Sequence, residues 1–520
     1  MDGFPEGFAA LSRSELWRAQ KEFFSEVGVE AWREEVPYYV TSNSYLANAY
    51  AALLFALRCD CPAEEPVYVL ELGAGPGVLS FRILRRLREL HEIAGRPLAG
   101  LRYVMSDVAE KNVRFWEGHP WLRPFVEEGV LDFAGFDVSG DSPLDLRRSG
   151  VRLDRDGPGS PERLLVVIAN YLVDVTPQDL FRVHRGELQE VLVRTAVELP
   201  EPPSRSLRLD AVPDNVRCRH ADLPYYGVPA LDGLLEPLRD HGEDNLFSLP
   251  VSALRCLERL RERVARQVFL LVADKGLTEP EPAPGTSALV FGINGRCVSA
   301  LVNFHALARY AVASGGTARH VSSRGIVTGA YSIGFDLASH PRTRLALAQH
   351  FETCNPGALF DVQEHFQRTQ PQTSLETLVA LLRLTSWDPT LFHACHETLL
   401  ARLPYANAGA VQDLVAGLER ITAQQLPIPG AADVWFDAGV LLQELRRYRE
   451  ALELYAGSLE HCGLSDFCLY NMGLCHYFLG EIDRALERFR EVLEITPDYV
   501  SARGWIAQIE HERRANAPEG

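Results

Sequence analysis

The segment Val67–Gly77 reads VYVLELGAGPG and decides the fold. Its first half is a valine-rich apolar run that ends in an acid and a leucine, which is typical of a buried parallel strand. Three glycines at a spacing of two then indicate a tight turn, and a helical pattern follows over 78–90. Backbone without Cβ atoms lets a ligand approach closely, and the helix N-terminus offers free N–H groups. In open α/β sheets, such a turn binds nucleotides at the carboxyl end of the strand.

The spacing of the glycines distinguishes between cofactors. Dinucleotide-binding turns need G-x-G-x-x-G, whereas Glu71, Gly73, Gly75 and Gly77 form E-x-G-x-G-x-G. This arrangement resembles the first motif of the S-adenosylmethionine-dependent methyltransferases. The resemblance implies that Glu71 helps to hold the methionine ammonium group and that the glycines make room for the amino-acid part of the cofactor. We therefore expect S-adenosylmethionine as the cofactor, and a NAD-linked oxidoreductase fits the glycine spacing poorly.

Composition limits the classes of partner. The chain has 520 residues, enough for two to four domains, and a formal net charge of −18. Because nucleic-acid binding needs a positive field, we expect no nucleic-acid partner. Its ten cysteines lack zinc-ligand spacing, so we expect free buried thiols, a reducing cytosol and no metal. Neither a signal peptide nor an apolar run of about 18 residues is visible, so we expect a soluble cytoplasmic protein without a membrane partner.

Strand and helix patterns alternate over 61–340 and predict a Rossmann-like α/β methyltransferase domain with a mostly parallel sheet. The expected strands are 67–72, 101–106, 131–136, 164–169 and 268–273, with 287–293 and 318–324 closing the sheet and a last hairpin within 322–335. Residues 198–250 carry many prolines and no clean period, so we interpret them as an insertion. Residues 1–60, with expected helices over 12–35 and 44–58, form a helical cap or substrate lid.

The C-terminal third has a helical pattern throughout. Residues 343–430 are expected to form a helical linker or solenoid-like region. Residues 433–463 and 467–497 superpose at an offset of 34, which places Gly439 on Gly473 and Tyr455 on Phe489. This period and its small and aromatic positions are typical of tetratricopeptide repeats. We therefore expect an all-α repeat domain over 431–515, with a capping helix, that binds a protein or peptide substrate or partner.

Polar residues follow three of the expected strands. Asp107 ends the second strand and is expected to accept both ribose hydroxyls of the cofactor. Asp137 ends the third and is expected to accept from the adenine amino group. Asn170 ends the fourth, where the transferred methyl should lie. The alternative for each residue is an ordinary helix cap or turn, but recurrence at successive strand ends favours one shared ligand.

Four further segments resemble the MidA-like family, which includes the mitochondrial complex I assembly arginine methyltransferase. Ala169–Pro177 (ANYLVDVTP) is similar to its aNE-x-x-DAlP motif, and Tyr38–Asn43, Phe269–Gly276 and Leu301–Ala313 are similar to three others. The resemblance covers about 35–330. It implies protein arginine methylation with Asn170, Tyr171, Asp174 and Tyr39 as catalytic candidates. Tyr171, however, stands where the family has an acid, and a tyrosine cannot hold a guanidinium fork as a carboxylate does.

Three functions therefore remain open. The first is methylation of a protein or peptide nitrogen, with the repeats recruiting the substrate. The second is a non-catalytic scaffold or assembly factor that binds the cofactor. The third is methylation of a small molecule in a biosynthetic pathway. Methyl transfer requires mainly alignment of the acceptor with the methyl group and exclusion of water, so the site residues alone do not distinguish between acceptors.

Overall fold

The computed structural model describes residues 7–34, 42–155, 164–194, 206–208, 216–237, 246–279, 290–294, 297–323, 325–354, 359, 362, 366, 368–369 and 372–515. The chain divides into two compact units, Met1–Glu364 and His365–Gly520. Every described strand lies in the first unit, and the described part of the second unit is helical. The predicted succession of an α/β region and an all-α region is thereby confirmed.

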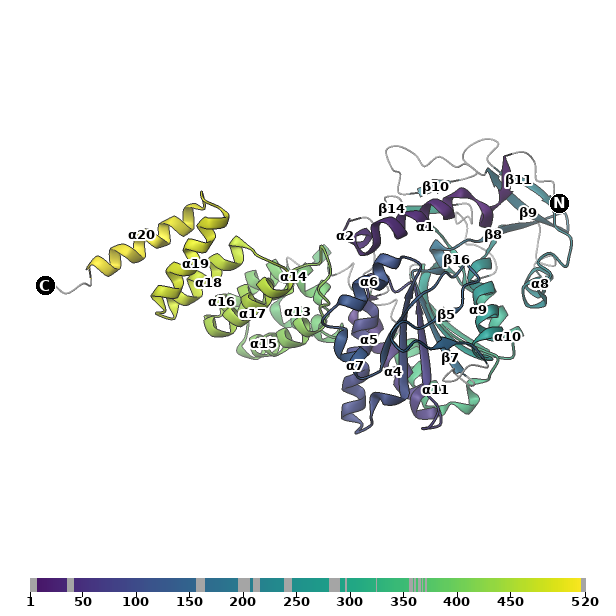
Figure 1. Ribbon diagram of the computed structural model, residues 1–520, viewed down its shortest axis with the longest axis horizontal. Helices are drawn as coiled ribbons and strands as arrows, with labels where there is room; N and C mark the ends of the chain where they lie inside the picture. The colour runs from purple at the N-terminus through teal and green to yellow at the C-terminus, as the bar shows by residue number, and fades with distance from the viewer. Residues whose placement is uncertain are drawn as a thin grey trace. The chain divides into compact units, whose positions relative to one another are not determined.

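An eight-stranded mixed sheet forms the centre of the first unit (Figure 1). Its parallel strands lie in the order β4 (Leu131–Gly135), β3 (Leu101–Asp107), β2 (Val67–Leu72), β7 (Leu164–Asn170) and β13 (Gln267–Leu277). Beyond β13 come the antiparallel hairpin strands β18 (Ile326–Ile333) and β17 (Thr317–Ser323), and the short β16 (Val302–Asn303) pairs with the end of β13. The mostly parallel sheet and its last hairpin agree with the prediction.

The strand order of the sheet reverses at β2, because the chain first adds strands on one side of β2 and then on the other. Counted along the chain, the parallel strands lie in the order 3-2-1-4-5, so β2 has later strands on both sides. Leu72 pairs with Ser106 on one side and Glu71 pairs with Ile168 on the other, which brings the carboxyl ends of β2, β3 and β7 level. Open α/β sheets bind their ligands at such a point.

Helices cover both faces of this sheet. On one face lie α4 (Ser44–Asp60) and α5 (Val78–Ile93), and on the other lie α9 (Val251–Arg263) and α10 (Phe304–Ala313) (Figure 1). Helix α11 (Pro341–Leu347) packs on α4. All six residues of β2 are buried, because helices cover the sheet on both faces, and all of them except Glu71 are apolar. Each fully buried Val or Leu contributes about 1.5–3 kcal/mol.

A second sheet was not predicted. It is antiparallel, with β1 (Phe8–Ala10), β9 (Glu187–Arg194), β8 (Asp179–His184) and β12 (Leu246–Leu249) in that order, and β11 (Val216–His220) also pairs with β9. Two of these strands and α8 (Pro229–Leu235) come from the segment 198–250, so the described part of that segment has regular secondary structure that its sequence did not reveal. That the segment is an insertion stays a prediction. Its strands are short and separated by polar, proline-rich stretches, which hides their alternation.

A third sheet corrects the predicted strand 287–293. The described part of that segment is β14 (Val290–Asn294), which pairs with β10 (Ser206–Arg208) and β15 (Cys297–Ala300) and lies outside the main sheet. The position next to β13 in the main sheet is taken by β18, which pairs with β13 from Val268 to Lys275.

The predicted helix 12–35 is also interrupted. Ser14 caps α1 (Glu15–Val27), whose end is followed by a 3-10 turn, η2 (Gly28–Glu30), and the short α2 (Ala31–Glu34). Gly28 has a φ of +65°, a left-handed conformation that stops a helix. Helix α1 crosses the end of the main sheet, where the strands β2 and β7 finish (Figure 1). The third predicted strand also stops earlier than expected, at Gly135, two residues before Asp137.

The second unit consists of antiparallel helix pairs. Its described helices are α13 (Leu375–Leu384), α14 (Pro389–Arg402), α15 (Ala408–Ala423), α16 (Val434–Glu444), α17 (Tyr448–His461), α18 (Asp466–Phe478), α19 (Ile482–Ile495) and α20 (Val500–Ala515). A Cβ atom on Gly439 would lie 2.6 Å from the ring of Tyr455, and one on Gly473 would lie 2.6 Å from the ring of Phe489. The two glycines therefore allow equivalent close helix crossings, as the repeat predicted.

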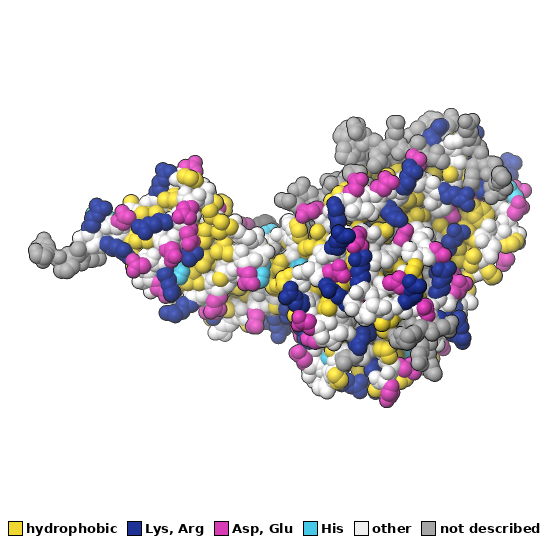
Figure 2. Space-filling model, in the orientation of Figure 1, with side chains coloured by type: hydrophobic (Ala, Val, Ile, Leu, Met, Phe, Trp, Pro, Cys, Tyr) yellow, Lys and Arg dark blue, Asp and Glu magenta, His cyan; other side chains and the backbone are white. Residues whose placement is uncertain are grey.

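The surface shows charges of both signs. Over the face drawn in Figure 2, Lys and Arg side chains alternate with Asp and Glu, and hydrophobic side chains lie between them. Within the described ranges, no helix combines the length and the apolar character needed to cross a bilayer. All ten cysteines are free thiols, and five of them are buried, so the expectation of buried thiols holds for half of them.

Candidate functional site

The glycine turn after β2 is held by the neighbouring strand and helix. The N–H of Gly75 donates to Asp107 Oδ2 (3.1 Å), and its carbonyl accepts from Trp116 Nε1 (3.1 Å). Gly75 has a φ of +56°, and a Cβ atom there would lie 2.8 Å from Cζ2 of Trp32. Gly77 has a φ of +81°, and its Cβ would meet Met105 Cε at 2.8 Å. Both positions therefore require glycine, for backbone conformation and for space.

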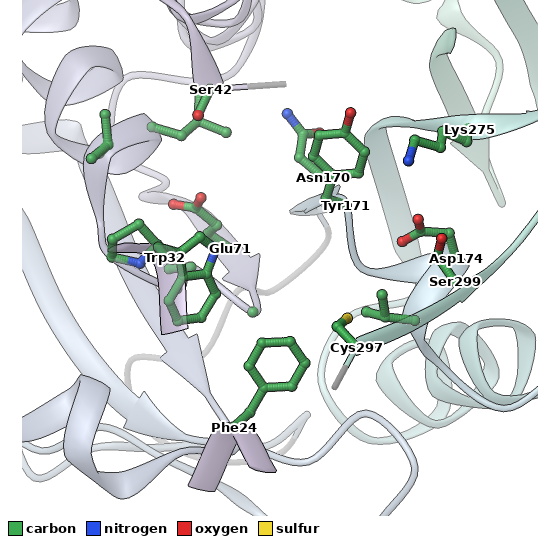
Figure 3. A pocket seen from close by; sticks show the side chains of 17 residues that line it. Phe24, Trp32, Ser42, Glu71, Asn170, Tyr171, Asp174, Lys275, Cys297 and Ser299 are labelled. Carbon is green, nitrogen blue, oxygen red and sulfur yellow. The ribbon is translucent and has the colours of Figure 1, made fainter. Parts of the chain in front are cut away.

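Two cavities adjoin this turn. The Glu71 cavity, drawn in Figure 3, has a volume of about 90 Å³ and the Asp107 cavity a volume of about 310 Å³. Phe24, Trp32, Gly73, Tyr171 and Val175 line both, so they form the partition between the two. Glu71, Gly75, Asn170 and Asp174 line the Glu71 cavity only, whereas Asp107 and Asp137 line the Asp107 cavity only.

The structure thus gathers most of the predicted site residues around one place. Gly77 is the exception among those described, because it lines neither cavity and instead begins α5 against Met105. Tyr39 and the neighbouring Tyr38 lie outside the described residues. The roles assigned to the individual residues stay predictions.

Glu71 lies at the bottom of its cavity with 4% of its surface exposed. Its Oε2 atom accepts hydrogen bonds from the hydroxyls of Ser80 and Tyr103, the latter at 2.7 Å. Burial raises the pKa of this carboxyl to about 7, although both hydroxyls oppose the shift by stabilising the charged form. Near neutral pH, the charge of the Glu71 carboxyl therefore depends on which group binds beside it.

Asp107 and Asp137 already have partners. Asp107 accepts from the N–H groups of Gly75 and Ala109 and from Asn112 Nδ2, at 2.8–3.1 Å, so it connects the glycine turn to the start of α6 (Glu110–Gly118). Burial raises the pKa of Asp107, and these donors oppose the shift. Asp137 accepts from Ser139 N–H (2.9 Å) and forms an ion pair with Lys21 Nζ (2.7 Å). Each carboxylate therefore also has a structural role.

Asn170 and Tyr171 lie where β7 ends. Asn170 Oδ1 accepts from the hydroxyl of Tyr50 (2.8 Å) and from the N–H of Ala273 (3.0 Å), so its amide is oriented by two elements. Tyr171 has a φ of +47°, which is rare for a residue with a large side chain. Such strain persists where surrounding structure enforces it, often at functional sites. Burial raises the pKa of the Tyr171 phenol, so it stays protonated.

Asp174 and Lys275 line the Glu71 cavity, and Asp274 contacts Asp174. Asp174 and Asp274 are 2% and 0% exposed, and the N–H of Asp174 donates to Asp274 Oδ2 (3.0 Å). Lys275 lines the cavity, with its ammonium 5.8 Å from the ring centre of Tyr171. Figure 3 shows Asn170, Tyr171, Asp174 and Lys275 on one side of the cavity and Trp32 and Glu71 on the other.

Sequence reasoning gave no role to Asp274 or Lys275. The signal was available, because Asp274 follows the apolar run 268–273 as Asp107 and Asn170 follow theirs. Sequence reasoning also missed the contacts that the N-terminal helix α1 makes near the site. Gln20 on α1 is 3% exposed, donates to Val175 O (2.9 Å) and accepts from Val298 N–H (2.7 Å). It thereby joins α1 to the loop after β7 and to β15, which carries the cavity residues Cys297 and Ser299.

Within the described ranges, no three His, Cys, Asp or Glu side chains gather as a metal ligand set. The polar side chains that line the cavities include carboxyls, amides, hydroxyls, a thiol, a phenol, two ammonium groups and a guanidinium. Such a set can bind the ammonium, hydroxyl and amino groups of an organic ligand.

Comparisons with known proteins bear on the two units separately. Residues 467–499 match the tetratricopeptide repeat family, so the second unit contains such a repeat. The chain is similar to the protein CTR9 homolog of Arabidopsis thaliana, with 29% identity over 120 residues. That stretch is 23% of this chain and 10% of the relative, so the chain spans about a tenth of that protein.

Solved structures that are similar to this chain include three with low TM-scores. One is a COG1565 superfamily member and "likely methyl transferase" from Burkholderia thailandensis bound to S-adenosyl-homocysteine, with 15% identity, 60% of this chain and 73% of that chain covered, and a TM-score of 0.34. A native structure of a COG1565 superfamily protein from the same organism has 15% identity, 60% and 72% coverage and a TM-score of 0.32. MamA of Desulfovibrio magneticus has 15% identity, 30% and 84% coverage and a TM-score of 0.24. TM-scores this low do not establish a shared fold.

Proposed function

We propose that the first unit is an S-adenosylmethionine-dependent methyltransferase. One observation carries the proposal: the four polar residues predicted from four separate strands, Glu71, Asp107, Asp137 and Asn170, all line the two cavities beside the glycine turn. The cavities lie at the carboxyl ends of β2, β3, β4 and β7, where the direction of winding reverses.

The residues present fit the cofactor in chemistry. Glu71 offers a buried carboxyl for an ammonium group, and Gly73 and Gly75 leave backbone open beside it. The Asp107 cavity combines carboxylates with the apolar side chains of Trp17, Phe136 and Val138, as a ribose and a flat base require. Its volume of about 310 Å³ lies at the lower end of the range of about 300–1,000 Å³ for small-molecule pockets. The bound cofactor would supply an electrophilic methyl group.

The acceptor we propose is a nitrogen of a protein or peptide, with arginine as one candidate, and the helical repeats of the second unit would recruit it. Repeat solenoids present extended surfaces suited to peptides. Asn170, Tyr171 and Asp174 would surround the acceptor, since all three line the Glu71 cavity. Because Tyr171 stands where the family has an acid, we favour an acceptor that does not need a carboxylate at that position.

Binding of S-adenosylhomocysteine, measured by isothermal titration calorimetry, tests the proposal. We expect a micromolar Kd for the full chain and at least a hundredfold loss for Gly75→Asp, because the new side chain enters the site beside Trp32. Gly129→Asp is the matched control: its φ of +68° is similar, but a Cβ there meets nothing within 4 Å. Absence of binding by the natural chain, or equal losses in both variants, would contradict the proposal.

A non-catalytic cofactor-binding scaffold is the second candidate, and Tyr171 in place of an acid favours it. Incubation with radiolabelled S-adenosylmethionine and host lysate separates the two. Label on a protein band supports the methyltransferase, and label on a small molecule supports a biosynthetic acceptor. Calorimetric binding without any labelled product supports the scaffold.

A further inference from the structure

Two side-chain hydrogen-bond donors line the same wall of the Glu71 cavity. Lys275 and Tyr171 both line this cavity, and within the described ranges neither the ammonium nor the hydroxyl has a hydrogen bond or an ion pair. The ammonium lies 5.8 Å from the centre of the Tyr171 ring. Figure 3 shows both side chains on the side of the cavity opposite Glu71. The two donors are therefore available to a bound ligand.

Both side chains extend from backbone that the main sheet holds in place. Lys275 lies in β13, where β18 pairs with Lys275 itself and β16 pairs with the next residue, Gly276. Tyr171 follows β7, and its N–H donates to the carbonyl of Ala273 in β13 (3.0 Å). Two neighbouring strands thus fix the backbone from which the donors reach the cavity.

A group that binds against this wall must offer lone pairs to it. An ammonium has three N–H donors and a phenol has one O–H donor, and donors that are covered by a ligand without an acceptor stay unsatisfied. Guanidinium and ammonium groups carry donors only, and the charge of Lys275 repels a second cation. A neutral imidazole has one nitrogen lone pair, and the incoming methyl group would use it. Arginine, lysine and histidine side chains therefore all leave the two donors unsatisfied.

We infer that the methyl acceptor is the side-chain carboxamide of an asparagine or a glutamine, whose oxygen accepts from Lys275 and Tyr171. The inference rests on the proposed function, in which a nitrogen of a protein or peptide takes the methyl group. Among nitrogen-bearing side chains, the carboxamide alone carries an acceptor oxygen beside its nitrogen. The electron pair of that nitrogen forms the new bond to carbon, the pair of the broken S–C bond stays on sulfur, and the nitrogen releases one proton to water.

The same wall also offers an acceptor for an N–H group of the carboxamide. Asp174 lines the cavity, and its Oδ1 atom is buried without a hydrogen-bond partner among the described residues. Lys275 interacts with Asp174 electrostatically, but the two side chains form no ion pair in the described structure. A carboxamide has both an acceptor oxygen and N–H donors, so it matches the donors and the acceptor of this wall together.

The cofactor's own carboxylate is the rival partner for the two donors. Its amino-acid end is expected beside Glu71 and the glycine turn, on the opposite side of the cavity from Lys275 and Tyr171 (Figure 3). Val78 and Leu79, which begin α5 directly after that turn, also line the cavity. Backbone N–H groups at a helix start suit a carboxylate. The position of Lys275 therefore favours the methyl acceptor over the cofactor.

Chemical analysis of the transferred label tests the acceptor. The full chain is incubated with host lysate and S-adenosylmethionine radiolabelled on its methyl group, and the labelled protein is hydrolysed in hot acid. An N-methyl carboxamide then yields volatile methylamine, whereas methylarginine and methyllysine stay non-volatile. We expect most of the label as methylamine. Label in methylarginine, methyllysine or a methylated hydroxyl would overturn the carboxamide and leave the methyltransferase standing.

Lys275→Met and Tyr171→Phe test the two donors, because each removes a donor and keeps a side chain of similar size. We expect Lys275→Met to lower methylamine release at least about tenfold and Tyr171→Phe about fivefold, with the Kd for S-adenosylhomocysteine unchanged within about threefold. Lys111→Met is the control, since Lys111 on α6 lines neither cavity. Unchanged release in Lys275→Met, or a Kd for S-adenosylhomocysteine that rises about tenfold, would overturn the inference.

Direct binding decides the inference even where no lysate protein is labelled. Saturation-transfer NMR compares N-acetylglutamine N-methylamide with N-acetylarginine N-methylamide on the full chain saturated with S-adenosylhomocysteine. We expect transfer to the glutamine probe alone and its loss in Lys275→Met. Transfer to the arginine probe, or to neither probe, would refute the carboxamide. If the natural chain binds no S-adenosylhomocysteine, the methyltransferase proposal fails, and the same comparison without cofactor still decides whether this wall binds a carboxamide.

Discussion

The indole of Trp32 lies against the backbone of Gly75, so closely that a Cβ atom on Gly75 would come within 2.8 Å of it. Trp32 also packs on Phe24, with ring centres 5.5 Å apart, and both rings line both cavities. Residues near the start of the chain thus form the partition at the glycine turn. A cofactor that occupied both cavities would therefore contact the Trp32 indole.

Trp32 should therefore report cofactor binding. We expect S-adenosylhomocysteine to change the intrinsic tryptophan fluorescence of the full chain, because the environment of the Trp32 indole changes on binding. Trp32→Phe should reduce that change, and Trp17, which lines the Asp107 cavity, should account for what remains. Trp505→Phe, in the second unit, should retain the full change. An undiminished signal in Trp32→Phe would mean that the ligand does not contact the Trp32 indole.

Gln20 should contribute strongly to the stability of the first unit. Gln20→Ala leaves the carbonyl of Val175 and the N–H of Val298 without their buried partner. Each of the two unsatisfied groups costs about 1–3 kcal/mol, so we expect a loss of about 2–6 kcal/mol in the free energy of unfolding, measured by urea titration.

The control for Gln20 lies on the same helix. Glu22 has a side chain that is 64% exposed, so Glu22→Ala should change the free energy of unfolding by less than about 0.5 kcal/mol. Equal effects of the two substitutions would mean that Gln20 does not join α1 to β15 and the loop after β7.

Glu71 should make stability depend on pH. Burial raises its pKa from 4.5 to about 7, so the folded chain binds this proton more tightly than the unfolded chain does. The resulting stabilisation is fully present below pH 4.5 and is lost as the pH rises to about 7, because the buried carboxyl then ionises. Its size is on the order of 3 kcal/mol.

Glu71→Gln provides the measurement, since an amide oxygen can still accept from Ser80 and Tyr103. We expect the difference in free energy of unfolding between the natural chain and this variant to fall between pH 4.5 and 7 and to be constant above. A difference that stays flat from pH 4 to 8 would show that Glu71 ionises normally.

The repeat crossing at Gly473 should tolerate no side chain. Gly473→Ala would place a methyl group 2.6 Å from the Phe489 ring, and such overpacking typically costs about 1–3 kcal/mol. Gly504→Ala on α20, where a Cβ meets nothing within 4 Å, should instead leave stability unchanged or raise it, because alanine favours helix. Thermal unfolding followed by circular dichroism compares the two. Similar melting temperatures would show that α18 and α19 do not cross closely at Gly473.

Local pattern predicted the main sheet well. The runs at 67–72, 101–106, 164–169 and 268–273 are mostly buried on both faces, so they are predominantly apolar and each is readable without knowledge of its neighbours. The repeat at Gly439 and Gly473 was equally readable, because the same close crossing recurs at a constant offset. Asp107 and Asn170 were found because each ends such a run.

The antiparallel sheets were not predicted, because their local sequence pattern is weak. Their strands are short, and β11 and β12 come from a proline-rich segment in which alternation is brief. The break at Gly28 was missed because the hydrophobic pattern continues past it. Asp274 was visible at the end of its strand, but its meaning depends on Asp174, 100 residues earlier in the chain.

The sequence by itself determined the parallel strands, the glycine turn, the polar residues at the strand ends and the helical repeats, since these depend on local periodicity and on residues that only one backbone conformation accepts. Tertiary structure decided which of those residues share a cavity, that Trp32 and Gln20 reach it from the N-terminal segment, and that Asp174 meets Asp274. Contacts between distant segments follow from strand order and helix packing, and these arise from the burial of the whole chain rather than from any one stretch of it.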